Sequence, residues 1–197
     1  MSNYKDSLAY FKQVLAKFSS TLGLDLCIAG GAIRDIHHDR VPKDIDIEVL
    51  NFGDSRYSLG NDDLTLLCDE LENIGACHVE LYSNYNGEAA ANLDFLIKFK
   101  WQGTDFDLIL QTSRPTTPKE AVANYDMSLN QVFFYGGEFD VSALERTFTT
   151  GTIEPTGKMI TLNRLSKMIK KYPEYDYTRM VKYIIPHEPD EAQKPIL

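Results

Sequence analysis

Apolar side chains recur along this sequence at two different intervals. Near the N-terminus the interval is three or four residues, which is typical of an amphipathic helix and predicts one over about residues 3–20. Elsewhere apolar residues alternate at an interval of two or form short runs, which predicts strands. The expected strands lie at 24–29, 44–50, 77–83, 92–100 and 104–111, and the further helices at 31–38, 61–74, 118–124, 160–172 and about 176–185.

Turn residues separate several of these segments. Gly75 is placed to end the helix at 61–74. Gln102-Gly103 is suited to a two-residue hairpin turn between the last two strands. A loop rich in Asn and Gly over 83–91 is expected to join the two strands before that turn.

Composition narrows the class of protein. The 197 residues are 43% apolar and 25% charged, which suits one globular domain with, at most, a helical appendage. The three cysteines form no CxxC pair, which argues against a disulfide scaffold and a zinc knuckle. The N-terminal segment mixes charged with apolar residues, unlike a signal peptide, and no apolar run is long enough to span a bilayer. We therefore expect a cytoplasmic protein without a membrane partner.

Charge is distributed unevenly along the chain. The net charge of −9 argues against a protein whose whole surface binds nucleic acid. Residues 158–182, however, hold seven basic and two acidic side chains, so this segment carries +5 and the rest of the chain −14. The basic segment is compatible with an RNA partner, although most runs of charged residues only contact solvent.

The most informative stretch, GGAIRDIHHDRVPKDIDIE, covers residues 30–48. Its glycine pair, Gly30 and Gly31, separates a strand from a helix and offers backbone N–H groups to a phosphate. Asp44 and Asp46 occupy alternate positions among apolar residues, so both carboxylates project from one face of a strand. Two adjacent anions persist when a cation lies between them, and Mg²⁺ prefers such oxygen ligands. This combination is typical of phosphoryl or nucleotidyl transfer.

The same stretch resembles the head of the nucleotidyltransferase superfamily that includes DNA polymerase beta. The subgroup most similar to it comprises bacterial poly(A) polymerases and CCA-adding tRNA nucleotidyltransferases, which carry GGxVRD, a short arm and DxD. The matching residues are Gly30, Gly31, Arg34, Asp35, Arg40, Lys43, Asp44 and Asp46. The match is clear over about residues 24–50 and fainter to 172. It implies an α+β fold: a mixed central sheet flanked by helices in a head over 1–150, then a short helical neck and an extended tail over 151–197.

The resemblance also implies the positions of nucleotide and metal. The triphosphate of an NTP is expected on Gly30, Gly31, Arg34 and Lys43. Two Mg²⁺ ions are expected between Asp44, Asp46 and a third acid, which in the superfamily lies between apolar residues on a later strand. Asp107, in the segment DFDLIL, fits that third position best. Asp105 is the second candidate and Asp94 the third, while a merely polar strand face would show the same alternation.

A later stretch, NYDMSLNQVFF, resembles the RRDFTINAL motif of the subgroup. Asp126 and Asn130 match its aspartate and asparagine, which lie near the nucleotide sugar, whereas Asn124 and Tyr125 replace its two arginines. Asp126 is also placed to cap a turn. The apolar end of the stretch favours a strand and the resemblance favours the start of a helix, so the secondary structure of 126–135 stays open.

The segment TLNRLSKMIKKY resembles the EDxxRxxRAxRF helix that follows the head. Arg164 and Lys167 match its basic positions and are expected near the nucleotide, whereas Ile160 and Thr161 replace the acidic pair that helps to read the incoming base. An amphipathic helix explains the same pattern. The residues expected inward on that interpretation are Leu162, Leu165, Met168, Ile169 and Tyr172.

The sequence thus predicts a Mg²⁺-dependent nucleotidyltransferase that moves an NMP from an NTP to an acceptor hydroxyl and releases pyrophosphate. The acceptor stays open between a small molecule, a protein and a short RNA, because 197 residues leave little room for a helical body that holds tRNA. The alternative is a non-catalytic module of the same fold that binds a nucleotide or a partner protein. The missing arginine and acidic pairs motivate that alternative.

Overall fold

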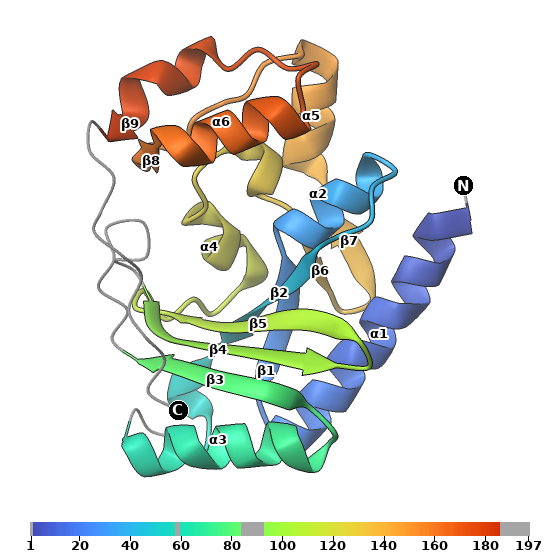
Figure 1. Cartoon of the computed structure of the whole chain (residues 1–197), viewed down its shortest axis with the longest axis vertical. Helices are drawn as coiled ribbons and strands as arrows, with labels where there is room; N and C mark the ends of the chain where they lie inside the picture. Colours follow the sequence, from blue (N-terminus) through green and yellow to red (C-terminus); the bar gives the residue numbers. More distant parts are fainter. Residues whose placement is uncertain (1, 58–59, 84–92, 186–197) are drawn as a thin grey trace.

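A mixed sheet forms the centre of the computed structural model, which describes residues 2–57, 60–83 and 93–185. Within those residues, seven strands hydrogen-bond in the order β3-β4-β5-β2-β1-β6-β7 (Figure 1). The strands are β1 (Asp25–Ala29), β2 (Asp44–Leu50), β3 (Cys77–Ser83), β4 (Leu93–Trp101), β5 (Thr104–Gln111), β6 (Phe133–Tyr135) and β7 (Glu138–Asp140). The α-helices are α1 (Ser2–Leu22), α2 (Gly31–His37), α3 (Asn61–Asn73), α4 (Pro118–Ala123), α5 (Ser142–Thr150) and α6 (Leu162–Lys171). The α+β fold predicted from the sequence is confirmed.

The register of the central strands determines where the acidic side chains lie. β2 and β5 run parallel, whereas the other pairings in this sheet are antiparallel. Asp46 is opposite Asp107 and Asp44 is opposite Asp105 in the β2–β5 pair. Because side chains alternate across a strand, these four carboxylates belong to one face of the sheet.

The opposite face of the central strands is apolar and packs on helices. Ile45 and Ile47 of β2 are buried there. Phe18 of α1 contacts Phe99 and Phe106 edge-on, with both ring centroids 5.5 Å away. The period-two pattern of β2 therefore divides the strand between a hydrophobic core and an acidic face.

The C-terminal part lies at the opposite end of the molecule from α3 (Figure 1). It contains α5, α6, the 3₁₀ helix η3 (Thr178–Tyr183) and a small parallel sheet of β8 (Ile160–Thr161) and β9 (Ile184–Ile185). One core cluster extends from the central sheet into this part, where it includes Leu165, Met168 and Tyr172. The predicted boundary near residue 150 therefore divides two stretches of sequence that share a core, and the division into domains stays a prediction.

Several local predictions agree closely with the structure. The expected strands at 44–50, 77–83 and 104–111 coincide with β2, β3 and β5. Gln102 and Gly103 both have positive φ, as a two-residue hairpin turn between β4 and β5 requires. The open segment 126–135 contains both a 3₁₀ turn, η2 (Ser128–Asn130), and β6. The expected loop after residue 83 and the extended tail from 186 lie outside the described residues.

Other local predictions are wrong. Leu162 and Ile169, expected inward on α6, are 59% and 42% exposed, because a narrower stripe of this helix is buried. The second tail helix is a 3₁₀ helix, and β7 and α5 have no counterpart among the predicted elements.

No helix in the described ranges combines the length and the apolar character that crossing a bilayer requires.

Candidate functional site

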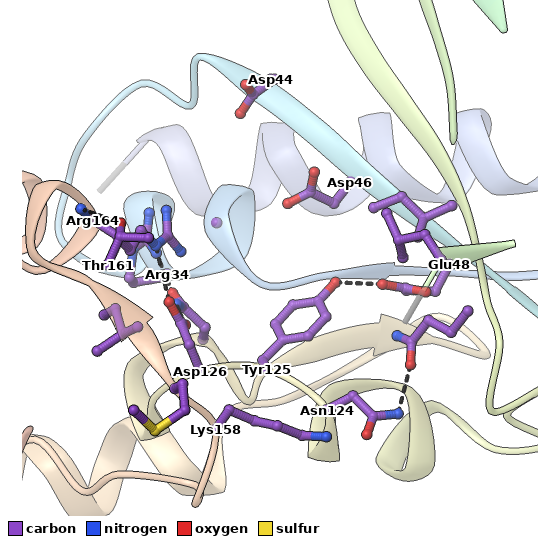
Figure 2. A pocket seen from close by; sticks show the side chains of 17 residues that line it. Arg34, Asp44, Asp46, Glu48, Asn124, Tyr125, Asp126, Lys158, Thr161 and Arg164 are labelled. Carbon is purple, nitrogen blue, oxygen red and sulfur yellow. Dashed lines mark hydrogen bonds and ion pairs between the residues drawn. The ribbon is translucent and has the colours of Figure 1, made fainter. Parts of the chain in front are cut away.

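A cavity of about 580 Å³ opens on the acidic face of the sheet, between β2 and the neck (Figure 2). β2 contributes Asp44, Asp46 and Glu48 to its lining. The other polar or charged side chains that line it are Arg34, Gln111, Asn124, Tyr125, Asp126, Asn130, Lys158, Thr161 and Arg164. Most of the residues predicted for nucleotide and metal are therefore brought together in one pocket, although they come from segments up to 133 positions apart.

Two of the predicted metal ligands, Asp44 and Asp46, differ in their surroundings. Asp44 is near the rim, with a side chain that is 44% exposed and lies 3.8 Å from the ammonium of Lys43. Asp46 lies deeper. Burial raises the pKa of Asp46 to about 7, and the negative charges of Asp107 and Asp44 add to the rise. Burial and the neighbouring carboxylates thus disfavour the ionised form of Asp46.

Each candidate for the third acid has a basic partner. The Lys98 ammonium donates to Asp107 Oδ2 at 2.9 Å, and Lys100 lies 3.2 Å from Asp105. Burial raises the pKa of Asp107 in spite of the bond from Lys98. None of the three candidates is part of the pocket lining itself. Asp94 accepts from Arg114 at 2.6 Å and, unlike Asp105 and Asp107, is not paired with a residue of β2. Of the three, Asp107 is the one opposite Asp46 in the sheet.

The donor set in this pocket fits Mg²⁺ in part. The side chains of Asp44 and Asp46 offer only oxygen, which is the ligand type that Mg²⁺ prefers. Burial is the main cause of the raised pKa of Asp46, and the repulsion from Asp107 and Asp44 that adds to it would be relieved by a divalent cation. Across the described ranges, however, no three acidic, His or Cys side chains are spaced to hold a metal ion. Asp44 and Asp46 therefore stay predicted metal ligands, and Asp107 is engaged with Lys98.

Gly30 and Gly31 differ in how well each position would accommodate a side chain. Gly30 has a φ of 65°, and a Cβ at this position would lie 2.5 Å from the Tyr125 ring, so a side chain there is excluded on both counts. At Gly31 a Cβ would meet only Arg34 Nη2 at 3.6 Å and Asp46 Oδ2 at 3.8 Å. A predicted phosphate ligand and a predicted metal ligand therefore both lie beside Gly31.

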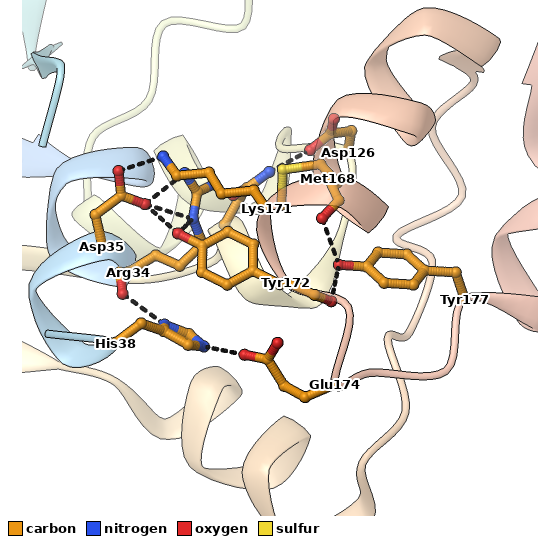
Figure 3. A network of polar contacts seen from close by, with 10 residues as sticks. Arg34, Asp35, His38, Asp126, Met168, Lys171, Tyr172, Glu174 and Tyr177 are labelled. Atoms are coloured by element: carbon orange, nitrogen blue, oxygen red, sulfur yellow. Dashed lines mark hydrogen bonds and ion pairs between the residues drawn. The ribbon is translucent and has the colours of Figure 1, made fainter. Parts of the chain in front are cut away.

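Arg34 is fixed by a buried polar network (Figure 3). Its Nε donates to Asp35 Oδ1 at 3.1 Å and to the Tyr172 hydroxyl at 2.9 Å, and its Nη1 donates to Asn130. The Tyr172 hydroxyl donates to Asp35 Oδ1, and the Lys171 ammonium donates to Asp35 Oδ2 at 2.5 Å. Burial alone would raise the pKa of Asp35, but these partners outweigh it and hold that pKa below its ordinary value. Asp35 thus positions Arg34 and the neck together.

A second set of contacts continues this network across the pocket. Asn130 Nδ2 donates to Asp126 Oδ1 at 2.6 Å, and Arg164 Nε donates to Asp126 Oδ2 at 2.9 Å. Three of the four residues predicted from the two later motifs are therefore linked through Asp126. Three predicted nucleotide-binding residues do not line the pocket: Lys43 and Lys167, which are exposed, and Gly30, which is buried.

Glu48 and Tyr125 belong to the site although neither was among the predicted site residues. Glu48 is 1% exposed, and its Oε1 accepts a hydrogen bond of 2.7 Å from the Tyr125 hydroxyl. Burial raises the pKa of Glu48 to about 8, although Tyr125 and Gln111 act against the rise. The signal was present in the sequence, because Glu48 continues the alternation of Asp44 and Asp46 on the same face of β2.

Comparison with known proteins identifies the fold. No family model matches this sequence, and no curated protein sequence matches it significantly. Among solved structures, a tRNA-processing enzyme in an apo form is similar with a TM-score of 0.50 and 19% identity, over 72% of this chain and 37% of that one. The Thermotoga maritima CCA-adding enzyme complexed with tRNA is similar with a TM-score of 0.51 and 15% identity, over 82% and 36%. The chain thus spans little more than a third of their length, and at these identities the likeness shows a shared fold.

Proposed function

We propose that this protein is a Mg²⁺-dependent nucleotidyltransferase that moves an NMP from an NTP to an acceptor hydroxyl and releases pyrophosphate. The observation that supports it most is the in-register placement of Asp44 and Asp46 beside Asp105 and Asp107 on one face of the sheet. This face opens into the cavity where Gly31 also lies. The shared fold with tRNA-processing and CCA-adding enzymes agrees with the proposal.

Four residues that line the pocket have roles in this proposal. Asp44 and Asp46 would hold Mg²⁺, which when bound neutralises phosphate charge and polarises the phosphorus under attack. Gly31 lets the triphosphate approach the backbone closely. Arg34 supplies positive charge from within its network, since its field already acts on Asp46.

Asp107 would assist the acceptor. In the proposed reaction an acceptor hydroxyl attacks the α-phosphorus, its proton passes toward Asp107, and pyrophosphate leaves. Lys98 holds that carboxylate at 2.9 Å and thereby fixes its orientation. The raised pKa of Asp107 makes it a better proton acceptor than an exposed aspartate.

The test is transfer of labelled NMP, with Mg²⁺ and a panel of acceptors. The double variant Asp44→Ala, Asp46→Ala is expected to lose ~10³-fold or more in rate, which corresponds to several kcal/mol of transition-state stabilisation. Asp107→Asn and Asp105→Asn form a matched pair on one strand, each with a lysine partner. Loss in the first alone would assign the third acid, and full activity in the double variant would refute the proposal.

RNA is the acceptor class for which the neck offers a specific feature. Lys167 and Lys170 of α6 are exposed within the basic segment 158–182, whereas Lys171 is bound to Asp35. The informative variant therefore neutralises Lys167 and Lys170 and keeps Lys171. If RNA is the acceptor, this variant should bind short RNA more weakly and with a shallower dependence on salt concentration.

A non-catalytic nucleotide-binding module is the second candidate. Two observations favour it: Lys98 already neutralises Asp107, and Tyr125 stands where the resembling motif has an arginine. Mg²⁺-dependent binding of NTP without release of pyrophosphate, across every acceptor tested, would support this candidate over the enzyme.

A further inference from the structure

The pocket contains a buried acceptor atom that nothing in the proposed reaction uses. Glu48 is 1% exposed yet contributes to the pocket lining. Its Oε1 accepts from Tyr125, but no residue in the described part of the chain donates to its Oε2. Buried polar atoms are nearly always hydrogen-bonded, and one that borders a cavity without a partner points to a ligand that supplies the missing donor.

Gln111 interacts with the Glu48 carboxyl and opposes the rise in its pKa, but both of its amide atoms also bond to other groups. Gln111 Nε2 donates to the Ala121 carbonyl at 3.0 Å, and its Oε1 accepts from Asn124 Nδ2 at 2.7 Å. Leu93 and Ile109 add apolar surface to the same lining. This end of the pocket therefore combines apolar walls with one open acceptor, which suits a flat ring that carries a hydrogen-bond donor on its edge.

Glu48 lies close to Asp46, beside which the proposed function places the phosphates. Glu48 is two residues beyond Asp46 on β2, so the two side chains project from the same face roughly 7 Å apart. A ribose and a base ring bridge a spacing of this kind. Figure 2 shows the Tyr125 ring between Glu48 and Asp126, with its hydroxyl turned toward Glu48.

We propose that Glu48 and Tyr125 form a subsite for the nucleobase of the NTP, in which Glu48 Oε2 accepts a hydrogen bond from an exocyclic amino group. This inference rests on the proposed function, since it assumes that the phosphates lie near Asp46. Tyr125 is the positioning residue that fixes the carboxyl group. The subsite favours bases that carry an amino group over otherwise equal bases that lack one, because only the former satisfy the open oxygen.

The experiment is run above pH 8, where Glu48 is ionised and its Oε2 can accept a hydrogen bond. It measures dissociation constants for NTPs that differ in such a group: GTP against ITP, and CTP against UTP. Ca²⁺ replaces Mg²⁺ to suppress turnover. The wild-type protein is expected to bind the amino-bearing member of at least one pair about tenfold more tightly. Glu48→Ala and Glu48→Gln should each reduce this ratio to near one, and Tyr125→Phe should reduce it in part. Glu138→Gln, at an exposed position on β7, serves as the control and should keep the ratio.

Inorganic tripolyphosphate is the probe that separates the two proposals. It lacks a base, so its affinity should be the same in the wild-type protein and in both Glu48 variants, which also shows that these variants fold. NTPs that bind with a ratio near one in the wild-type protein would overturn the base subsite alone. Binding of neither NTP nor tripolyphosphate would overturn the proposed function and the subsite with it. Unchanged base preference in both variants, together with lost transfer to an acceptor, would assign Glu48 to the acceptor instead.

Discussion

Asp46→Asn is expected to stabilise the metal-free protein at neutral pH while it abolishes the proposed transfer reaction. Burial and the charges of Asp107 and Asp44 raise the pKa of Asp46 from 3.8 to about 7. In the unfolded chain this group ionises near its ordinary value, so between about pH 4 and 7 the unfolded state binds fewer protons than the folded state. The free energy of unfolding therefore falls as the pH rises through this window, and the full penalty is present above it.

The size of the penalty follows from the shift. One pKa unit corresponds to ~1.4 kcal/mol, so a rise from 3.8 to about 7 sets an upper limit of ~4 kcal/mol. Asp46 is only partly buried, and solvent screening reduces this to ~2–3 kcal/mol. Asparagine keeps the shape and removes the charge. Asp46→Asn should thus exceed the wild-type protein in stability by this amount at pH 8 and by little at pH 4.

Urea unfolding in EDTA at several pH values measures this difference directly. Subtracting the two proteins removes the contributions of other groups that titrate in the same range. Asp44→Asn is the matched comparison: Asp44 is exposed at the pocket rim and its charge makes only part of the rise in the pKa of Asp46, so this variant should gain less stability than Asp46→Asn. Adding Mg²⁺ at pH 8 should raise the Tm of the wild-type protein and leave that of Asp46→Asn unchanged. A stability difference between wild type and Asp46→Asn that is constant from pH 4 to 8 would refute the reasoning.

Three further substitutions test the geometry of the pocket. Gly30→Ala should lower the free energy of unfolding by ~1–3 kcal/mol, because its Cβ would meet the Tyr125 ring at 2.5 Å in a backbone conformation that alanine disfavours; thermal denaturation measures this. Gly31→Ala should fold normally, since its nearest neighbours lie at 3.6 Å or more, and should weaken NTP binding about tenfold by blocking the approach of a phosphate. Lys98→Met should lower the Mg²⁺ concentration that half-saturates NTP binding by about fivefold, because it frees the Asp107 carboxylate; an unchanged midpoint would show that this lysine does not compete with the cation.

Elements fixed by local pattern could be predicted from the sequence. The alternation in β2 and β5 identifies both strands and the side of the sheet that carries Asp44 and Asp46, because strand geometry alone dictates it. The basic partner of Asp107 was also within reach. In a two-residue hairpin at Gln102-Gly103, Lys98 is directly opposite Asp107, and the structure has this register.

Contacts between distant segments could not be predicted in this way. Arg34 is held by Asn130 and Tyr172, which are 96 and 138 positions away, and no periodicity relates them. Tyr125 shows the same limit. The resembling motif indicates that an arginine is replaced, but only the fold shows that the tyrosine ring packs on Gly30 and bonds to Glu48.

The apolar stripe of α6 illustrates a different limit. Amphipathic spacing gives the direction of the buried face but not its width, which depends on what the helix packs against. Leu165 and Met168 are buried, while Leu162 and Ile169 at the edges of the stripe are exposed. Thr161 instead caps the helix by accepting from the Arg164 backbone N–H at 3.1 Å.

The tie between Arg34 and Tyr172 has a consequence for dissecting this protein. A fragment that stopped near residue 150 would keep every strand of the large sheet. It would, however, leave Arg34 without Tyr172 and Asp35 without Lys171. A buried cation and a buried anion that lose such hydrogen-bond partners strongly destabilise the folded state. Separate expression of the N-terminal portion should therefore give an unstable product. The neck supports Arg34 structurally and also forms one wall of the pocket.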